Sequence, residues 1–237
     1  MKYIKLLFFP LCALILISGL LHANEGDDAD RAAAAFYKAR AYETGEGAPK
    51  SIEDAIRWYT ISASLGNPEA QNNIGNIYYY KDVPPNYKEA LKWFTLAGKQ
   101  GLVKAQHLVG VIYFKARGVE QDYIKAAHWF RLAALQGDVT SMFNLGLFYD
   151  KGYGVERNLN EAFKWYLKTA EYGYAEGQFN SALMYAKGEG TNINLVKAHR
   201  LMNKSAEQKF PGAARNLKVI WGMMDANEQI LASQNIN

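Results

Sequence analysis

Residues 141–173 read SMFNLGLFYDKGYGVERNLNEAFKWYLKTAEYG, and the pattern of this stretch recurs along the chain. A tryptophan followed by a second aromatic residue marks each copy, at Trp58, Trp93, Trp129 and Trp165, which lie 35, 36 and 36 residues apart. Tyrosine recurs in the same register, at Tyr42, Tyr78, Tyr113, Tyr149 and Tyr185. An internal period of this length predicts an array of structural repeats rather than one globular core.

Each unit contains two segments with helical periodicity. We count positions in the first segment from its opening small residue, so that Ala105 is position one. The recurrent residues then fall at positions one, five, six and nine, which share one face of a helix. The second segment, such as residues 160–171, places an alanine three residues before each tryptophan and is also predicted to be helical. Five helical hairpins are expected, and they open near Ala34, Ala70, Ala105, Ser141 and Gly177.

Small residues recur at two further places in each unit. Position six carries Ala39, Gly75, Gly110, Gly146 and Ala182. Their size predicts a close approach of a neighbouring helix, which outweighs the helix cost of glycine, roughly 1 kcal/mol. A glycine row follows the second segment, where a left-handed residue readily ends a helix. This row is Gly66, Gly101, Gly137 and Gly173.

Glycines also lie between the two segments, as in residues 152–155, 45–47 and 188–190, whereas the third unit keeps only Gly118 and Val119. A dinucleotide-binding glycine motif follows a strand. These glycines follow a predicted helix and recur in register, so they indicate turns. The second unit has Lys81-Asp82-Val83-Pro84-Pro85 in a loop one residue shorter. Its hairpin angle is expected to differ.

These residues resemble the Sel-one-like repeat family, whose pattern is Ala-x3-Leu-Gly-x2-Tyr-x2-Gly-x-Gly-Val, then Ala-x2-Trp-Tyr-x3-Ala and a closing Gly. The fourth unit matches it at Leu145, Gly146, Tyr149, Gly152, Gly154, Val155, Ala162, Trp165, Tyr166, Ala170 and Gly173. The resemblance covers about residues 34–212. It implies an all-α, right-handed α-solenoid of about five hairpins and a role in protein interaction or as an adaptor, and it implies no chemistry.

The end of the chain departs from the repeat. From Ala213 a sixth unit shows only its first helix, with Lys218 in place of the small residue and Trp221 in place of the tyrosine. A C-terminal capping helix is predicted, since no following unit buries its outer face. Residues 213–237 are therefore assigned to this capping helix and a polar tail, and the tail from Asp225 is expected to fray.

The start of the chain has the pattern of a secretory signal peptide. Lys2 and Lys5 precede the mostly apolar residues 6–21, and an acidic cluster follows. We expect a signal peptide at residues 1–23, cleaved after Ala23, then an acidic leader at 24–33 and a periplasmic or secreted protein. An uncleaved inner-membrane anchor is the alternative. Cys12 lies inside the apolar run, so the mature chain would hold no disulfide or thiolate zinc site.

The composition narrows the class of protein further. The chain is 49% hydrophobic and 21% charged, which excludes disordered and collagen-like classes. The formal charge of +4 is small for 237 residues, so binding of nucleic acid through a basic stripe is not expected. After signal cleavage no membrane insertion is expected either.

Motifs for catalysis are missing from the sequence. It contains no Gly-x-Ser-x-Gly elbow, no Walker loop and no His-Glu-x-x-His. Some relatives of the family are discussed as acting on β-lactams, but no serine has a lysine three residues later. His107, His128 and His199 occupy places of the repeat that do not match. We therefore predict no enzyme, no cofactor and no metal site.

Positions three, seven and ten lie opposite the core face of the first helix. In solenoids of this type the first helices line the concave face. Units three to five place six large apolar residues there: Val111, Phe114, Phe143, Leu147, Phe179 and Leu183. Soluble monomers rarely expose such a stack. A groove for an apolar helix or extended segment is expected, and the alternative is a superhelix tight enough to bury the row.

The same positions are more polar in the first units. Asn72, Asn76 and His107 are expected to form a polar end of the groove, and Arg40 with Glu43 a charged one. Phe36 and Tyr79 complete the predicted partner-binding set.

The leading hypothesis is a non-enzymatic, exported repeat protein that binds a protein partner, of unknown identity, through this concave face. The partner could be an envelope protein. Exported proteins that resemble this chain also serve as periplasmic immunity proteins against interbacterial toxins, such as a lipase, and this is the alternative. A hydrolase with an unrecognised site is a third hypothesis, without a supporting motif. A homodimer through the same face is a competing occupant, because a self-complementary patch needs only two-fold symmetry.

Overall fold

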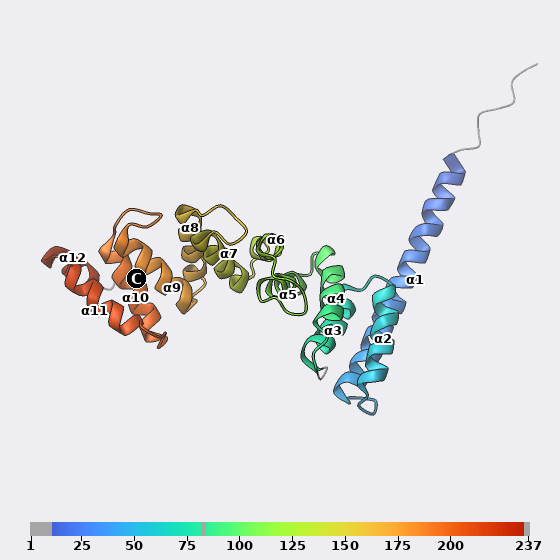
Figure 1. Cartoon of the computed structure of the whole chain (residues 1–237). Coiled ribbons are helices and arrows are strands. Elements are labelled where there is room, and N and C mark those ends of the chain that lie inside the picture. The colour runs from blue at the N-terminus through green and yellow to red at the C-terminus, as the bar shows by residue number, and fades with distance from the viewer. Residues whose placement is uncertain (1–10, 82–83, 235–237) are drawn as a thin grey trace, which may run out of the picture. The chain divides into compact units, whose positions relative to one another are not determined.

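The computed structural model describes residues 11–81 and 84–234, and throughout these ranges the regular structure is helical (Figure 1). The chain forms two compact units, which meet in sequence between Gln100 and Gly101. Unit one contains α1 (Leu11–Thr44), α2 (Ile52–Ser64), α3 (Pro68–Asn76), the π-helix η1 (Ile77–Lys81) and α4 (Tyr87–Lys99). The predicted all-α class is confirmed.

Unit two contains the remaining hairpins. Its helices are α5 (Val103–Phe114), α6 (Tyr123–Leu135), α7 (Val139–Lys151), α8 (Leu159–Glu171), α9 (Ala175–Lys187), α10 (Leu195–Glu207), α11 (Ala213–Met223) and α12 (Ala226–Ser233). Each helix from α5 to α10 contacts the next one along the chain, so the first and second helices of successive repeats alternate (Figure 1). The expected helical hairpins of the repeats are therefore present.

Each of the five hairpin loops is closed by the same two hydrogen bonds. The side chain of the residue before the second helix accepts from the backbone N–H three residues later, which caps the helix. The backbone N–H of that cap residue donates to the carbonyl of the position-nine tyrosine. The cap residues are Ser51, Asn86, Asp122, Asn158 and Asn194. The tyrosine row thus marks where each loop closes.

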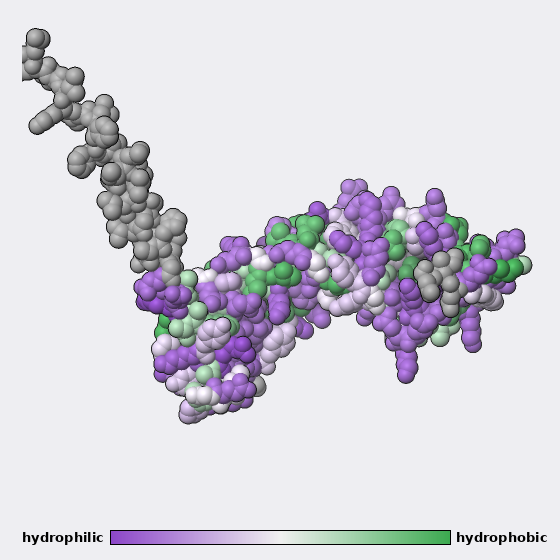
Figure 2. All heavy atoms as spheres, turned by 180° about the vertical axis from the view of Figure 1, so that it is seen from behind, coloured by the Kyte–Doolittle hydropathy of each residue, from purple (hydrophilic) through white to green (hydrophobic). Residues whose placement is uncertain are grey.

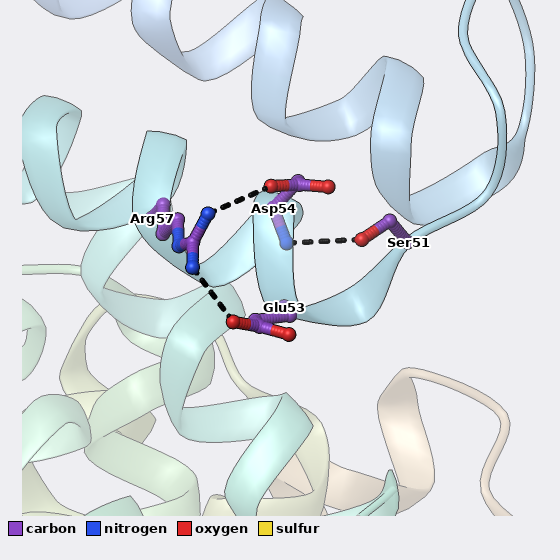
Figure 3. A network of polar contacts seen from close by, with 4 residues as sticks. All are labelled: Ser51, Glu53, Asp54 and Arg57. Atoms are coloured by element: carbon purple, nitrogen blue, oxygen red, sulfur yellow. Dashed lines mark hydrogen bonds and ion pairs between the residues drawn. The ribbon is translucent and has the colours of Figure 1, made fainter.

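The first of these caps lies beside a small ion-pair network (Figure 3). Ser51 Oγ accepts from the Asp54 N–H, and the Arg57 guanidinium reaches Glu53 at 2.7 Å and Asp54 at 3.3 Å. All of these charges are on the surface, where such pairs contribute at most about 1 kcal/mol. The cap itself, and not the ion pairs, sets where α2 begins.

The second hairpin differs from the others at the end of its first helix. At its C-terminal end, α3 continues into the π-helix η1. The closing bond from the Asn86 N–H to the Tyr78 carbonyl is nevertheless kept, at 2.9 Å. The second hairpin therefore departs from the others by a local widening at the end of its first helix.

Position six lies directly against a ring from the second helix of the same hairpin. A Cβ atom added at Gly75, Gly110 or Gly146 would come within 2.6 to 2.8 Å of a ring carbon. The three rings belong to Phe94, Phe130 and Tyr166, the residues that follow the repeat tryptophans. The prediction of close packing at position six is confirmed, and the partner is an aromatic ring.

The predicted left-handed positions are also confirmed, with φ between +84° and +97° at Gly66, Gly101, Gly137 and Gly173. Two residues that are not glycine adopt the same conformation. Lys209 has φ +58° one repeat after Gly173, and Ala116 has φ +53° one repeat before Gly152. The repeat imposes its backbone on these two side chains, which disfavour it by about 1 to 2 kcal/mol each.

Lys209→Gly and Ala116→Gly are therefore expected to raise the free energy of unfolding by about 1 kcal/mol each, because glycine relieves the left-handed strain. Urea unfolding followed by circular dichroism measures the change. Lys204→Gly is the matched control, since Lys204 lies inside helix α10. It should lower stability by about 1 kcal/mol. Equal losses for both lysine variants would contradict the strain argument.

The N-terminal segments that were expected to be separate run into one helix. Residues 1–10 of the expected signal peptide lie outside the described residues, and residues 11–33 form α1 together with the first repeat helix. The acidic segment 24–33 is therefore helical. Ala32 and Ala35 are buried, and Arg31 pairs with Asp28 at 2.8 Å. Within the described ranges, no helix has the length and apolar character needed to cross a membrane.

The C-terminal tail forms a further helix, which corrects the expectation of fraying. Asp225 and Glu228 make a reciprocal capping box at the start of α12. Helix α12 contacts α10, and the Arg200 guanidinium donates to the Leu231 carbonyl at 2.8 Å. The Asp-x-x-Glu pattern was the available sequence signal for this helix. Residues 235–237 of the tail lie outside the described residues.

Candidate protein-interaction surface

The six apolar residues predicted in repeats three to five all lie in the second compact unit of the chain, Gly101–Asn237. We call these six residues the unit-two row. They are Val111 and Phe114 on α5, Phe143 and Leu147 on α7, and Phe179 and Leu183 on α9. Each is half-buried. Each packs on the edge of a hydrophobic cluster while part of its surface faces water. The structure therefore shows neither the fully exposed groove nor the fully buried row that the sequence left open.

The phenylalanines of the row rest on rings of the core. The Phe143 ring centroid lies 5.5 Å from that of Tyr166, and the Phe179 centroid lies 5.1 Å from that of Phe210. Phe114 is enclosed further, with four rings around it, the nearest being Phe148 at 5.2 Å. Phe143 and Phe179 are thus the aromatic residues of the row that the core holds least.

Figure 2 shows hydrophobic residues among hydrophilic ones near the C-terminal end. Several large apolar side chains on α11 and α12 are exposed there: Val219, Trp221, Met223, Ile230 and Leu231. Trp221 contacts the His199 ring at 5.1 Å. The outer face of the predicted cap is thus uncovered by the described residues of this chain.

His107 is held in a polar contact that joins two repeats. Its Nδ1 lies 2.9 Å from Ser141 Oγ and 3.3 Å from Asp138 Oδ2. The same Asp138 oxygen accepts from the Ser141 N–H at 2.7 Å and caps α7. His107 lies on the predicted face, but its partners were not foreseen, because Ser141 belongs to the next repeat and Asp138 caps the first helix of that repeat.

Serine, histidine and aspartate in contact raise the question of nucleophilic catalysis. A catalytic triad needs the serine and the aspartate on opposite nitrogens of the imidazole. Here both oxygens face Nδ1, and Ser141 is completely buried. The cluster therefore fits a structural joint between repeats. Among the described residues, no group of three histidine, cysteine, aspartate or glutamate side chains is placed to hold a metal ion.

Burial raises the pKa of Asp138, but hydrogen bonds from His107 and Ser141 outweigh it and hold the pKa below the ordinary value of 3.8. A lowered folded-state pKa stabilises the fold above the unfolded pKa, and this contribution disappears as the pH falls through the folded value. Asp138→Asn keeps a capping side chain without the charge. The stability difference between wild type and this variant should shrink from pH 7 to pH 3 in urea unfolding, and an unchanged difference would contradict the pairing.

The predicted partner-binding residues of unit one are less accessible than expected. Asn72 and Tyr79 each expose only 4% of their surface, so they are corrected to buried residues. Tyr79 is enclosed by the rings of Tyr80, Tyr87 and Phe94. Tyr79 lies in the π-helix η1, whereas Asn72 is buried within α3. Phe36 and Asn76 remain half-buried.

A polar network that sequence analysis largely missed surrounds Glu43 in unit one. Tyr59 Oη donates to one Glu43 oxygen at 2.6 Å, and Lys81 Nζ donates to the other at 2.6 Å. Asn73 Nδ2 donates to Tyr59 Oη at 3.0 Å. Arg40 and Glu43 were predicted as a charged end. Tyr59 follows a repeat tryptophan and was counted among the core aromatic residues. Lys81 lies at the end of the π-helix η1.

Burial raises the pKa of Glu43, but hydrogen bonds from Lys81 and Tyr59 and the positive charges of Lys81 and Arg40 outweigh it and lower the pKa below 4.5. Burial of the hydroxyl raises the pKa of Tyr59, and its hydrogen bond to the Glu43 carboxylate raises that pKa further. Glu43 is therefore ionised, and Tyr59 is neutral, at physiological pH.

The Sel1 repeat family model matches five consecutive segments of the chain, at residues 32–67, 68–102, 103–138, 139–174 and 175–210. These segments agree closely with the five hairpins expected at residues 34–212. Sel1 repeats are typically protein–protein interaction modules and typically non-enzymatic scaffolds.

Two solved structures resemble the chain over 85% of its length. One is a protective antigen present in uropathogenic Escherichia coli strains, with an SLR fold, 37% identity and a TM-score of 0.76. The chain covers 44% of that protein and therefore spans less than half of its length. The other is a Sel1 repeat protein from Oxalobacter formigenes, with 31% identity, a TM-score of 0.73 and 86% of its chain covered.

A more distant match is an immunity protein from Pseudomonas aeruginosa, with 17% identity and a TM-score of 0.41, which covers 85% of this chain and 75% of that one. No curated protein matches the sequence. The five contiguous repeat matches and the two structures above 30% identity agree with each other. The chain belongs to the Sel1 repeat family.

Proposed function

We propose that this chain is an exported, non-catalytic repeat protein that binds another protein through the unit-two row. The observation that carries the proposal is the register of the row. Three first helices present large apolar side chains at the same positions, with Val111, Leu147 and Leu183 at position seven. Each is half-buried, so part of every side chain is open to a partner without rearrangement of the core.

The aromatic residues of the row are suited to anchor a partner. Phe143 and Phe179 are supported on one side by Tyr166 and Phe210, which restricts their motion. Rigid, supported aromatic side chains carry much of the binding energy in protein interfaces. Typical Sel1 repeats are interaction modules, and this supports a protein as the occupant. Export is proposed from the N-terminal sequence alone.

The test is a double variant, Phe143→Ser with Phe179→Ser, compared with a matched control, Ile124→Ser with Leu135→Ser. The control residues lie on α6 and are 71% and 68% exposed, so their replacement removes apolar surface away from the row. Proteins are captured from the envelope fraction of the source cells, and each candidate is purified and titrated. We expect the row variant to weaken binding at least tenfold and the control to bind like wild type.

Circular dichroism must show that both variants keep native helicity. Equal affinity of the row variant and the wild type for the purified partner would overturn the proposal. Sedimentation of the purified chain tests the competing occupant. A concentration-dependent dimer that the row variant abolishes would assign the row to a second copy of the chain.

A further inference from the structure

A cavity of about 410 Å³ opens in unit one beside Glu43. Its walls include Phe36, Arg40, Glu43, Glu69, Asn73 and Lys81, which come from α1, α3 and η1. This volume suits a small ligand or one or two side chains of a peptide. The cavity is separate from the unit-two row, because all of its walls belong to the other unit.

The floor of this cavity is preorganised. Glu43 is held by Tyr59 on one oxygen and by Lys81 on the other, and Asn73 orients the Tyr59 hydroxyl. Tyr59 is completely buried, so the network is anchored in the core. A ligand would therefore meet fixed polar groups and would have little side-chain motion to suppress.

The cavity walls carry two cations, Arg40 and Lys81, and two carboxylates, Glu43 and Glu69, so their formal charges balance. Lys81 pairs with the carboxylate, and Arg40 adds a second cation close enough to lower the pKa of Glu43. Among the described residues, the Arg40 guanidinium has no hydrogen bond or ion pair of its own. Arg40 and Lys81 both line the cavity, and an anion bound there would accept from their remaining donors.

The chemistry of the walls favours a carboxylate over a phosphate. An arginine fork matches the two oxygens of a carboxylate. A phosphate group carries nearly two negative charges and would be repelled by Glu43 and Glu69, which share the cavity. The Phe36 ring offers an apolar contact to carbon atoms next to the acid group.

We propose that this cavity binds a carboxylate of a protein segment, with the acid group between Arg40 and Lys81 and the adjoining apolar atoms on Phe36. The carboxylate can belong to an acidic side chain or to a C-terminus, and the probes below distinguish these sources. The proposal goes beyond the unit-two row, so that either can fail while the other stands.

The probes are three acetylated peptides that differ only in their carboxylates. The first has the order serine, leucine, glutamate, leucine and ends in an amide. The second has glutamine in place of glutamate and ends in an amide, so that it has no acid group. The third is the glutamine peptide with a free C-terminus. Calorimetric titration of the full chain should show at least one acidic peptide binding roughly tenfold tighter than the neutral one.

Variants at Arg40 and Glu43 are expected to change the affinity for the acidic peptide in opposite directions. Arg40→Gln should weaken the acidic peptide roughly tenfold, because it removes the free fork. Glu43→Gln should strengthen it, because it removes the like charge. Arg57→Gln is the matched control, since this arginine of the same unit is paired with Glu53 and Asp54 outside the cavity (Figure 3).

The expected pattern is loss for Arg40→Gln, gain for Glu43→Gln and no change for Arg57→Gln. Equal binding of the neutral and both acidic peptides, or equal losses for the two arginine variants, would overturn the proposal. Circular dichroism of the three variants confirms that unit one remains folded. If only the free C-terminus binds, the source is a chain end, and if only the glutamate peptide binds, the source is an acidic side chain.

Discussion

Gly154→Ala is expected to lower the free energy of unfolding by about 3 to 5 kcal/mol. A Cβ atom at this position would lie 2.3 to 2.5 Å from the backbone of Tyr123 and Ile124, at the start of α6. Backbone atoms at a helix start cannot rotate away as a side chain can. The left-handed φ of +64° adds strain to this clash.

Gly152→Ala is the matched control in the same loop. Gly152 is also left-handed, with φ +74°, but its nearest neighbour is a side-chain carbon of Arg157 at an ordinary 3.4 Å. The third repeat already tolerates Ala116 at this register position. The control should therefore lose only about 1 to 2 kcal/mol. Urea unfolding of both variants measures the difference. Similar losses of stability would show that glycine is required at position 154 by the left-handed turn alone and not by the clash.

The clash explains why the second glycine of the loop recurs. In the next repeat, a Cβ at Gly190 would lie 2.1 Å from the Leu159 carbonyl oxygen at the start of α8. In the first repeat, Gly47 has no atom within 4 Å. The loops of the fourth and fifth repeats thus pack on the second helix of the repeat before them. These glycines join neighbouring repeats as well as turning the chain.

Phe148→Ala is the second large effect, with an expected loss of about 3 to 5 kcal/mol. Phe148 is completely buried, and its ring contacts those of Phe114, Tyr123, Phe130 and Tyr153 at 5.2 to 6.1 Å. Phe114, Tyr123 and Phe130 belong to the third repeat, and Tyr153 lies in the loop of the fourth repeat. Removing the central ring leaves a cavity that the surrounding backbone cannot close.

Phe143→Ala is its control, five residues earlier on α7. Phe143 is half-buried and contacts one ring, that of Tyr166, so its replacement should cost about half as much or less. Thermal and urea unfolding give both values. If Phe143→Ala were as destabilising as Phe148→Ala, the unit-two row would be core, and the proposed interaction surface would lose its support.

The repeat architecture could be predicted from the sequence because every repeat uses the same local interactions to form its helices and turns. The tryptophan register, the position-nine tyrosines and the glycine row identify two helices, a closing loop and a left-handed helix end in every unit. Caps such as Asn158 and Asn194 need only the backbone N–H group three residues later as a partner. Local hydrogen bonds and backbone preferences act over a few residues, so a single sequence is sufficient to reveal them.

The accessibility of the candidate site was decided by tertiary structure. Helical periodicity placed Phe143 and Tyr79 on the same predicted face, yet one is half-buried and the other is buried. The difference comes from the π-helix and from rings contributed by other helices. Likewise, Lys81 reaches Glu43 across 38 residues of sequence. Burial and charge depend on contacts between segments distant in sequence, and a pattern with a period of 3.6 residues contains no information about those neighbours.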